Sequence, residues 1–147
     1  MTPQQVVAEA RSWIGTPFVH DAEVKGAGVD CAHIVNAVFS TAGKIQSVKF
    51  PHYKQDWWKH ATDPEQHIVE NYKKLFREIP VKDVKPGDIV VMFLGKAWAH
   101  SAIVSEVTNG EVTRAIEAWP TRNAVAEINV REERLYRNHK KRYFTCF

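Results

Sequence analysis

Cysteine is scarce in this sequence, which contains only Cys31 and Cys146. Two cysteines so far apart are too few for the disulfide framework of a small secreted domain. No apolar run approaches the ~20 residues that a membrane-spanning helix needs. Residues 1–15 also lack the basic start and the apolar stretch of a secretory signal, so we expect synthesis in the cytoplasm without a signal peptide.

Internal repeats, low-complexity tracts and domain linkers are absent as well. A chain of 147 residues is long enough to bury a sizeable core, so we expect a single domain over residues 1–147. The formal net charge of +3 is unevenly placed, because residues 131–147 hold six basic and two acidic groups. A basic segment of this size is usually a solvated edge, and nucleic acid is therefore not the expected partner.

Apolar residues at helical spacing predict three helices in the first half of the chain. Gly15 and Gly43 provide stops for the first two, and Asp30 is a typical N-cap for the second. Pro64 fits the first position of the third helix. The expected helices are residues 3–14, about 31–42, and about 64–76.

The second half has the pattern of an antiparallel sheet. Ile89–Leu94 is a continuous apolar run, typical of a buried strand. Asn109-Gly110 is a hairpin signal between two further strands. The expected strands are 89–94, 99–107, 111–119, 125–130 and, at the edge, 143–147. Helices followed by an antiparallel meander predict the α+β class, with the N-terminal helices packed on the sheet.

Cys31 is the first residue of the second predicted helix, directly after its cap. A helix N-terminus carries a partial positive charge and free N–H groups, which favour a thiolate over a thiol. The same position is also typical of a small, buried core residue. A catalytic thiol needs a base, so the histidines decide between the two interpretations.

His100 is the best candidate for that base, because it opens a predicted strand close to the hairpin. His33 points away from Cys31 on the same helix. Four other histidines lie in polar or basic surroundings and are expected at the surface: His52, His60, His67 and His139.

The hairpin register selects Glu117 as a partner for His100. With Asn109 and Gly110 in the turn, cross-strand positions sum to 219, and Glu117 becomes the diagonal neighbour of His100, about 7–8 Å away between Cα atoms. A carboxylate there fixes the imidazole tautomer and stabilises the imidazolium. The sequence thus predicts a Cys31–His100–Glu117 triad. Two alternatives stay open: a bulge could shift the hairpin register, or Glu117 could be an ordinary solvent-exposed strand residue.

Three segments resemble the NlpC-type cell-wall cysteine peptidases, which have a papain-like α+β core. WIGTPFVHDAEVKGAGVDCAHIVNAVF resembles their nucleophile region. KPGDIVVMF with AWAHSAIV resembles their histidine-bearing hairpin, and TRAIEAW resembles the strand with their third polar residue. The segments follow the family's order over about residues 5–130. PHYKQDWWKHATDPEQ further resembles the phage and prophage tail-associated branch of the family.

The resemblance implies Cys31 as nucleophile, His100 as base and Glu117 as the orienting group. Most members have His at the position of Glu117, and some have another polar residue. The implied reaction is hydrolysis of the γ-D-glutamyl–diaminopimelate bond of peptidoglycan stem peptides through a Cys31 thioester, with no cofactor and no metal. Phage tail proteins are the implied carriers, which would make the protein virion-associated and active in the cell wall.

Substrate-binding residues also follow from the resemblance. Family members hold the free amine of the first alanine with an Asp, a Ser and a Tyr. Of these only Asp30 has a counterpart, since Ala32 and Phe18 replace the Ser and the Tyr. Phe18 and Trp119, like Trp13 and Trp98, are candidate walls of the substrate groove, although each is also typical of a core residue.

Other functions stay open on the sequence alone. An acyltransferase or amidase would use the same Cys–His pair and resolve the thioester with an amine. A catalytically inactive, structural descendant in a phage tail would fit the departures at Ala32, Phe18 and Glu117. A metal site is not favoured, because the sequence contains no HExxH motif and no paired CxxC motifs. Binding of single-stranded nucleic acid by Trp57 and Trp58 lacks a nearby basic stretch.

Overall fold

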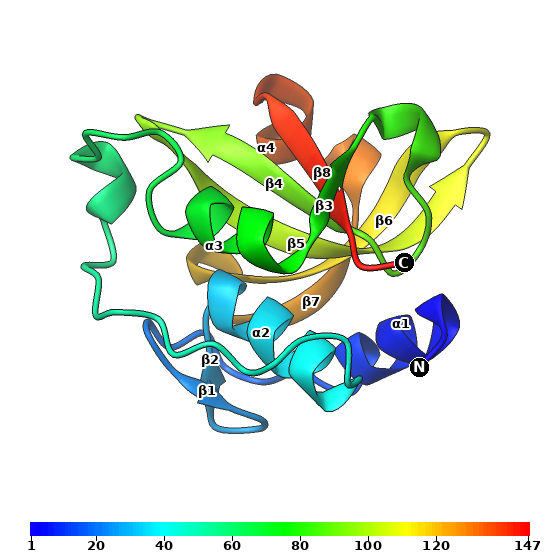
Figure 1. The fold of residues 1–147 in the computed structure, drawn as a ribbon, viewed down its shortest axis with the longest axis horizontal. Coiled ribbons are helices and arrows are strands. Elements are labelled where there is room, and N and C mark those ends of the chain that lie inside the picture. The colour runs from blue at the N-terminus through cyan, green and yellow to red at the C-terminus, as the bar shows by residue number, and fades with distance from the viewer.

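The structure, a computed structural model that describes residues 1–147, has four α-helices and a six-stranded antiparallel sheet (Figure 1). The helices are α1 (Pro3–Arg11), α2 (Cys31–Thr41), α3 (Ile68–Leu75) and α4 (Arg134–Asn138). The sheet contains β3 (Arg77–Ile79), β4 (Ile89–Leu94), β5 (Ala97–Thr108), β6 (Glu111–Trp119), β7 (Ala124–Asn129) and β8 (Lys141–Thr145). A separate ribbon is formed by β1 (Glu23–Val24) and β2 (Gly28–Val29). The predicted α+β class is confirmed.

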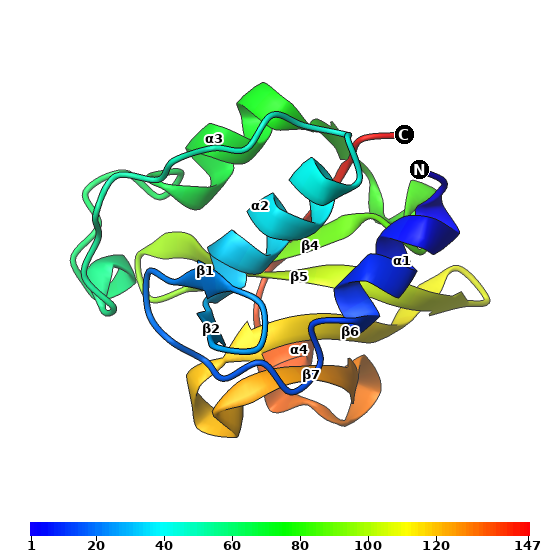
Figure 2. The same ribbon diagram turned by 90° about the horizontal axis from the view of Figure 1, so that it is seen from below.

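The sheet is covered on both faces. Helices α1, α2 and α3 lie on one face, and the short α4 lies on the other (Figures 1 and 2). Strand β4 contributes to both cores, with Ile89 and Val91 in the cluster under α2 and Val90 and Met92 in the cluster that includes Tyr136 of α4. Burial on both faces explains why β4 is a continuous apolar run. None of the helices is both long and apolar enough to cross a membrane.

The β5–β6 hairpin has the predicted turn. Asn109 and Gly110 both have positive φ, 53° and 77°, as a two-residue turn of type I′ requires. Each strand carries one extra residue, Ser105 on β5 and Thr113 on β6, and the two shifts cancel. The predicted register is therefore restored beyond the two extra residues, away from the turn, where Val104 pairs with Ala115 and Ile103 pairs with Ile116.

Helix α2 begins where the sequence predicts, at Cys31. The Asp30 side chain accepts a hydrogen bond from the backbone N–H of His33, which caps the first turn. The helix ends at Thr41, just before Gly43, whose φ of 69° suits the left-handed conformation of a stop.

The first and third helices are shorter than predicted. Helix α1 ends at Arg11 rather than at residue 14, because the chain turns there and Gly15 donates to the Val125 carbonyl of β7. Helix α3 begins at Ile68 rather than at Pro64. His67 lies at φ 66° and ψ −81°, and the N–H of Ile68 bonds the Gln66 carbonyl, so a tight three-residue turn separates the two segments.

The last strand is not at the edge of the sheet, as predicted, but inside it. The strand order is β3-β8-β4-β5-β6-β7, and β8 pairs with β3 on one side and β4 on the other. Strand β3 was not predicted, because three residues are too short for a recognisable alternation. The C-terminal segment is thereby tied into the core, with Phe144 fully buried.

Candidate active site

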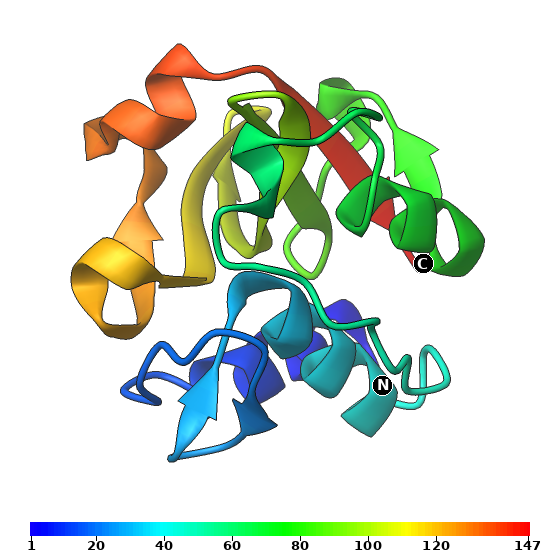
Figure 3. The same cartoon turned by 90° about the vertical axis from the view of Figure 1, so that its left-hand side faces the viewer.

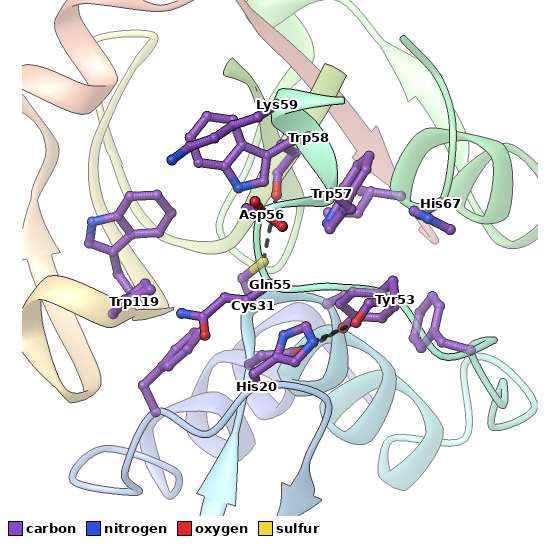
Figure 4. A pocket seen from close by; sticks show the side chains of 17 residues that line it. His20, Cys31, Tyr53, Gln55, Asp56, Trp57, Trp58, Lys59, His67 and Trp119 are labelled. Carbon is purple, nitrogen blue, oxygen red and sulfur yellow. Dashed lines mark hydrogen bonds between the residues drawn. The ribbon is translucent and has the colours of Figure 1, made fainter. Parts of the chain in front are cut away.

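Cys31 lies at the N-terminus of α2, against the start of β5. Its Sγ is 3.8 Å from the carbonyl oxygen of Ala99, the extra residue of a bulge between β4 and β5 (Figure 4). The Ser101 hydroxyl donates to the Cys31 carbonyl at 3.0 Å and is itself bonded to the Tyr72 hydroxyl at 2.9 Å. Bulges often aim a side chain at a functional site, and this one directly precedes His100.

His100 and Glu117 form a buried pair. The distance from His100 Nε2 to Glu117 Oε2 is 2.5 Å, and the exposed fractions of the two residues are 0% and 2%. An ionised carboxylate can only accept, so Nε2 carries a hydrogen, and Nδ1 is the nitrogen that gains or loses the second proton. Nδ1 is buried and has no hydrogen-bond partner. Burial lowers the pKa of His100, but Glu117 and the nearby Cys31 sulfur outweigh it and raise this pKa to about 9.

Glu117 is kept ionised by its surroundings. The Tyr136 hydroxyl donates to Oε2 at 2.9 Å, and the Arg122 guanidinium lies 3.7 Å from Oε1. Burial raises the pKa of Glu117, but His100, Tyr136 and Arg122 together hold it below its ordinary value. The structure thus brings Cys31, His100 and Glu117 together, and it adds Tyr136 and Arg122, which the sequence did not single out.

Replacing Tyr136 with phenylalanine is expected to lower the free energy of unfolding by about 2 kcal/mol at pH 7, because a buried carboxylate loses a donor. The folded-state pKa of Glu117 is depressed, so its stabilisation is complete above the unfolded value and is lost as the pH falls through the folded one. The Tyr136→Phe deficit should therefore shrink in strong acid. Urea unfolding at several pH values measures it.

Tyr143 provides a matched control, because it is half-buried on β8 and its hydroxyl makes no hydrogen bond to a side chain. Tyr143→Phe should change the free energy of unfolding by no more than about 0.5 kcal/mol. Equal losses for the two variants would contradict a bond between Tyr136 and an ionised Glu117.

Asp30, beside Cys31, is the centre of a second buried cluster. Its two carboxylate oxygens accept from the backbone N–H groups of Asp21 and His33, from His33 Nδ1 at 2.7 Å, and from the Tyr53 hydroxyl. Burial raises the pKa of Asp30, but these bonds outweigh it and hold the pKa below its ordinary value. Burial likewise opposes the charge on His33, yet Asp30 raises the pKa of His33 overall.

A cavity of about 440 Å³ opens over Cys31 (Figure 4). Phe18 and Trp119, two of the predicted groove walls, line it, whereas Trp13 is part of the main apolar core and Trp98 packs against that core and against Phe93. The sequence missed most of the opposite wall, which comes from the long segment between α2 and α3. That wall includes Phe50, Tyr53, Gln55, Trp57, Trp58 and His67.

His67 was predicted at the surface and instead lines this cavity, with its ring 4.7 Å from that of Trp57. Its polar neighbours in sequence gave no sign of this. The wall is attached to the β4–β5 turn, because the backbone N–H of Lys96 donates to the Trp58 carbonyl at 3.0 Å. The Trp58 ring also packs on Gly95, where a Cβ atom would lie only 2.8 Å from the ring. The segment crosses between the helices and the sheet in the side view (Figure 3).

The site places a thiol at the N-terminus of a helix, beside unpaired backbone donors. The N–H groups of Cys31 and Ala32 make no hydrogen bond within the chain, so they are free for a developing oxyanion. No group of three or more His, Cys, Asp or Glu side chains is arranged to hold a metal ion. The thiol, the imidazole and the carboxylate come from α2, β5 and β6, three elements of the confirmed fold.

Sequence comparison assigns the chain to a family. The NlpC/P60 family model matches residues 15–145, nearly the whole chain. The chain belongs to the NlpC/P60 family. Comparison with curated proteins gives no match.

Solved NlpC/P60 structures share this architecture. The NlpC/p60 domain of the peptidoglycan hydrolase SagA is 18% identical and matches 97% of each chain with a TM-score of 0.63. The peptidoglycan hydrolase RipB from Mycobacterium tuberculosis is 17% identical with a TM-score of 0.62; the match covers 99% of this chain but only 64% of RipB. Identities this low show the fold alone, and the predicted papain-like core is confirmed.

A third NlpC/P60 structure limits what the fold implies. RipD from Mycobacterium tuberculosis, described as a non-catalytic NlpC/p60 domain protein adapted to peptidoglycan binding, is 12% identical. The match covers 100% of this chain and 99% of RipD, with a TM-score of 0.61. Activity in this family therefore has to be argued from the side chains of each member.

Proposed function

We propose that this NlpC/P60 domain is a cysteine peptidase that hydrolyses the γ-D-glutamyl–diaminopimelate bond of peptidoglycan stem peptides. The observation that carries the proposal is the buried His100–Glu117 pair beside the Cys31 thiol. A buried carboxylate–imidazole pair is costly and often dispensable for stability, and, unlike Asp30–His33, this pair has an unpartnered ring nitrogen and is close enough to the Cys31 thiol to share its proton. The alternative of an inactive structural protein is therefore disfavoured.

In the first half of the reaction, the proton of the Cys31 thiol resides on Nδ1 of His100, so the two groups react as thiolate and imidazolium below pH about 9. The thiolate attacks the γ-carbonyl carbon of the D-glutamyl residue, and the carbonyl electrons move onto its oxygen. The backbone N–H of Cys31 donates to that oxyanion. When the carbon–nitrogen bond breaks, the diaminopimelate amine leaves with the proton from His100, and the glutamyl group remains on Cys31 as a thioester.

In the second half, water replaces the amine. His100 takes a proton from the water, whose oxygen attacks the thioester carbonyl. The carbon–sulfur bond breaks, and Cys31 recovers its proton from His100 while the γ-carboxylate leaves. Throughout, Glu117 holds Nε2 in the donor state and stabilises the imidazolium.

The test is digestion of purified muropeptides followed by mass spectrometry. Hydrolysis gives two fragments whose summed mass exceeds that of the substrate by one water, with a new free amine on diaminopimelate. An acyltransferase would instead join the glutamyl fragment to an added amine. Intact muropeptides after prolonged incubation with the folded protein would refute the proposed activity.

The rate is expected to fall in alkaline solution, because His100 must be protonated to release the leaving amine. Its pKa is raised above the ordinary value, so the imidazolium persists below pH about 9 and is lost as the pH rises through that value. We expect kcat/KM to drop about tenfold per pH unit above this point. A pH profile measures it, and an alkaline limb near the ordinary histidine value would contradict the role of Glu117.

Delivery by a phage tail stays a prediction. It is supported by the resemblance of residues 51–66 to the tail-associated branch, and these residues form much of the cavity wall. Detection of this chain in purified virions, by mass spectrometry, would support it.

A further inference from the structure

A second cavity lies beside α4, on the face of the sheet opposite α2 (Figure 2). Its volume is about 340 Å³, which suits a small-molecule site, and it shares no lining residue with the cavity over Cys31. Its walls include residues of α4, of strands β4, β6 and β8, and of the short turn Val81–Asp83. Among its lining residues only Tyr136 has a part in the peptidase reaction proposed above, so that reaction does not account for the others.

The sheet side of this cavity is apolar. Val90 and Tyr136 are almost fully buried members of the core cluster on this face, and Val112 and Tyr143 pack against that cluster. Val81 also lines the cavity, although 51% of it is exposed, and few large apolar side chains of this chain are left so open to water. An apolar group bound here would remove Val81 and Val112 from water, which favours its binding.

The polar lining of the cavity has an excess of positive charge. Arg131 and Glu111 form an ion pair at 3.1 Å and neutralise each other. Arg137 and Lys141 form no ion pair with any carboxylate of the chain. The Lys141 ammonium donates instead to the backbone carbonyl of His139, at 3.2 Å. Two cations at this cavity therefore lack a counter-ion.

Lys141 and Tyr143 present an ammonium and a hydroxyl from one strand. They are two residues apart on β8, so their side chains lie on the same face of the sheet. Lys141 is partly buried, and this burial lowers the pKa of its ammonium. The Tyr143 hydroxyl, half-buried as well, makes no hydrogen bond to a side chain. Both side chains thus have donors that the chain leaves free, and an anion would offset the cost of burying the ammonium.

We propose that this cavity is a binding site for an anion that carries an apolar group. Arg137 and Lys141 supply the positive charge for a carboxylate or phosphate head, and the Tyr143 hydroxyl adds a third donor. The apolar group packs against Val81 and Val112. Since both features belong to one cavity, a ligand with both should bind more tightly than a ligand with either alone. The site is independent of the proposed peptidase activity, because none of these side chains takes part in the reaction.

The test is an NMR titration of the isotope-labelled protein with small probes of related shape. We expect 4-phenylbutyrate to bind with a dissociation constant of at most about 1 mM and to shift the amide signals of Arg137, Lys141 and Tyr143. Acetate has the charged head without the apolar group, and 4-phenylbutanol has the apolar group without the charge. Each should bind at least about tenfold more weakly. Phenyl phosphate tests the phosphate head in the same way.

Two results would overturn the inference. One is equal binding of 4-phenylbutyrate and 4-phenylbutanol, which would show an apolar contact without recognition of the anion. The other is the absence of signal shifts around this cavity at up to about 10 mM of 4-phenylbutyrate and of phenyl phosphate. Binding of either anion at the cavity supports the inference, and the tighter of the two identifies the preferred head. Neither result bears on the peptidase activity, which is measured on muropeptides.

Charge variants of the lining make the test sharper. Arg137→Gln and Lys141→Gln should each weaken the binding of 4-phenylbutyrate at least about fivefold, because each removes a charged donor. Lys140→Gln is the matched control, since Lys140 is exposed, directly precedes Lys141 and does not line the cavity. It changes the net charge equally and should leave the affinity within about twofold. Equal losses in Lys140→Gln and Lys141→Gln would indicate general charge attraction and contradict the inference.

The two tyrosines of the cavity give a second matched pair. The Tyr136 hydroxyl donates to Glu117 at 2.9 Å, so it is already used, and a ligand meets only the ring. Tyr143→Phe should weaken the binding of 4-phenylbutyrate about threefold, because it removes a free donor. Tyr136→Phe keeps the ring and should leave the affinity unchanged. A loss in Tyr136→Phe but not in Tyr143→Phe would place the anion elsewhere and contradict the inference.

Discussion

Cys31→Ala is expected to lower kcat/KM for stem-peptide hydrolysis by at least about 10⁴-fold, because no other group can form the acyl-enzyme. The substitution removes a single sulfur from the first turn of α2, where Asp30 still caps the helix. The fold should therefore persist, and the loss should be confined to the chemical step. Initial rates on a muropeptide, with binding of the same muropeptide measured separately, check both parts.

The second cysteine provides the control for this variant. Cys146 follows β8 near the C-terminus and does not line the cavity, and burial raises the pKa of its thiol. Cys146→Ala should keep the wild-type rate. Iodoacetamide should inactivate the wild type and the Cys146→Ala variant alike, with the label on Cys31. Activity that survives complete modification of Cys31 would remove the thiol from the mechanism.

The pairing of His100 with Glu117 could be predicted from the sequence because it depends on local rules. An Asn-Gly turn fixes the hairpin register, and the register makes Glu117 the diagonal neighbour of His100. Two bulges occur in this hairpin, and either alone would have moved Glu117 to the other face of the sheet. They cancel because one falls on each strand, at Ser105 and at Thr113. Nothing in the sequence indicates that cancellation.

The missed parts depend on contacts between distant segments. Tyr136 reaches Glu117 from α4, 19 residues further along the chain, and Tyr53 reaches Asp30 from a segment without regular structure. Neither position has a periodicity that would mark it. His67 was placed at the surface from its polar neighbours, whereas the tight turn before α3 directs it to the cavity. The residues adjacent to His67 in sequence do not indicate which residues contact it in the folded protein.

The fold and the activity of this domain depend on different sets of residues. RipD shares the fold with this chain and is described as non-catalytic. The clusters that form the core are apolar and include neither His100 nor Glu117. The functional argument therefore rests on polar groups that the fold does not require: the imidazole, the carboxylate and the two donors that hold it.

Glu117→Gln is expected to lower kcat by about 10³-fold with little loss of folded protein, because the side chain keeps its shape and loses its charge. If the amide nitrogen faces His100, Nε2 must accept, and the proton moves to Nδ1, where it blocks transfer from the thiol. If the amide oxygen faces His100, the imidazolium still lacks its counter-charge. In both cases the alkaline limb should move from pH about 9 toward the ordinary histidine value. Glu111→Gln, an exposed change on the same strand, should alter neither the rate nor the limb. An unchanged rate in Glu117→Gln would make Glu117 a structural residue and reduce the catalytic machinery to Cys31 and His100.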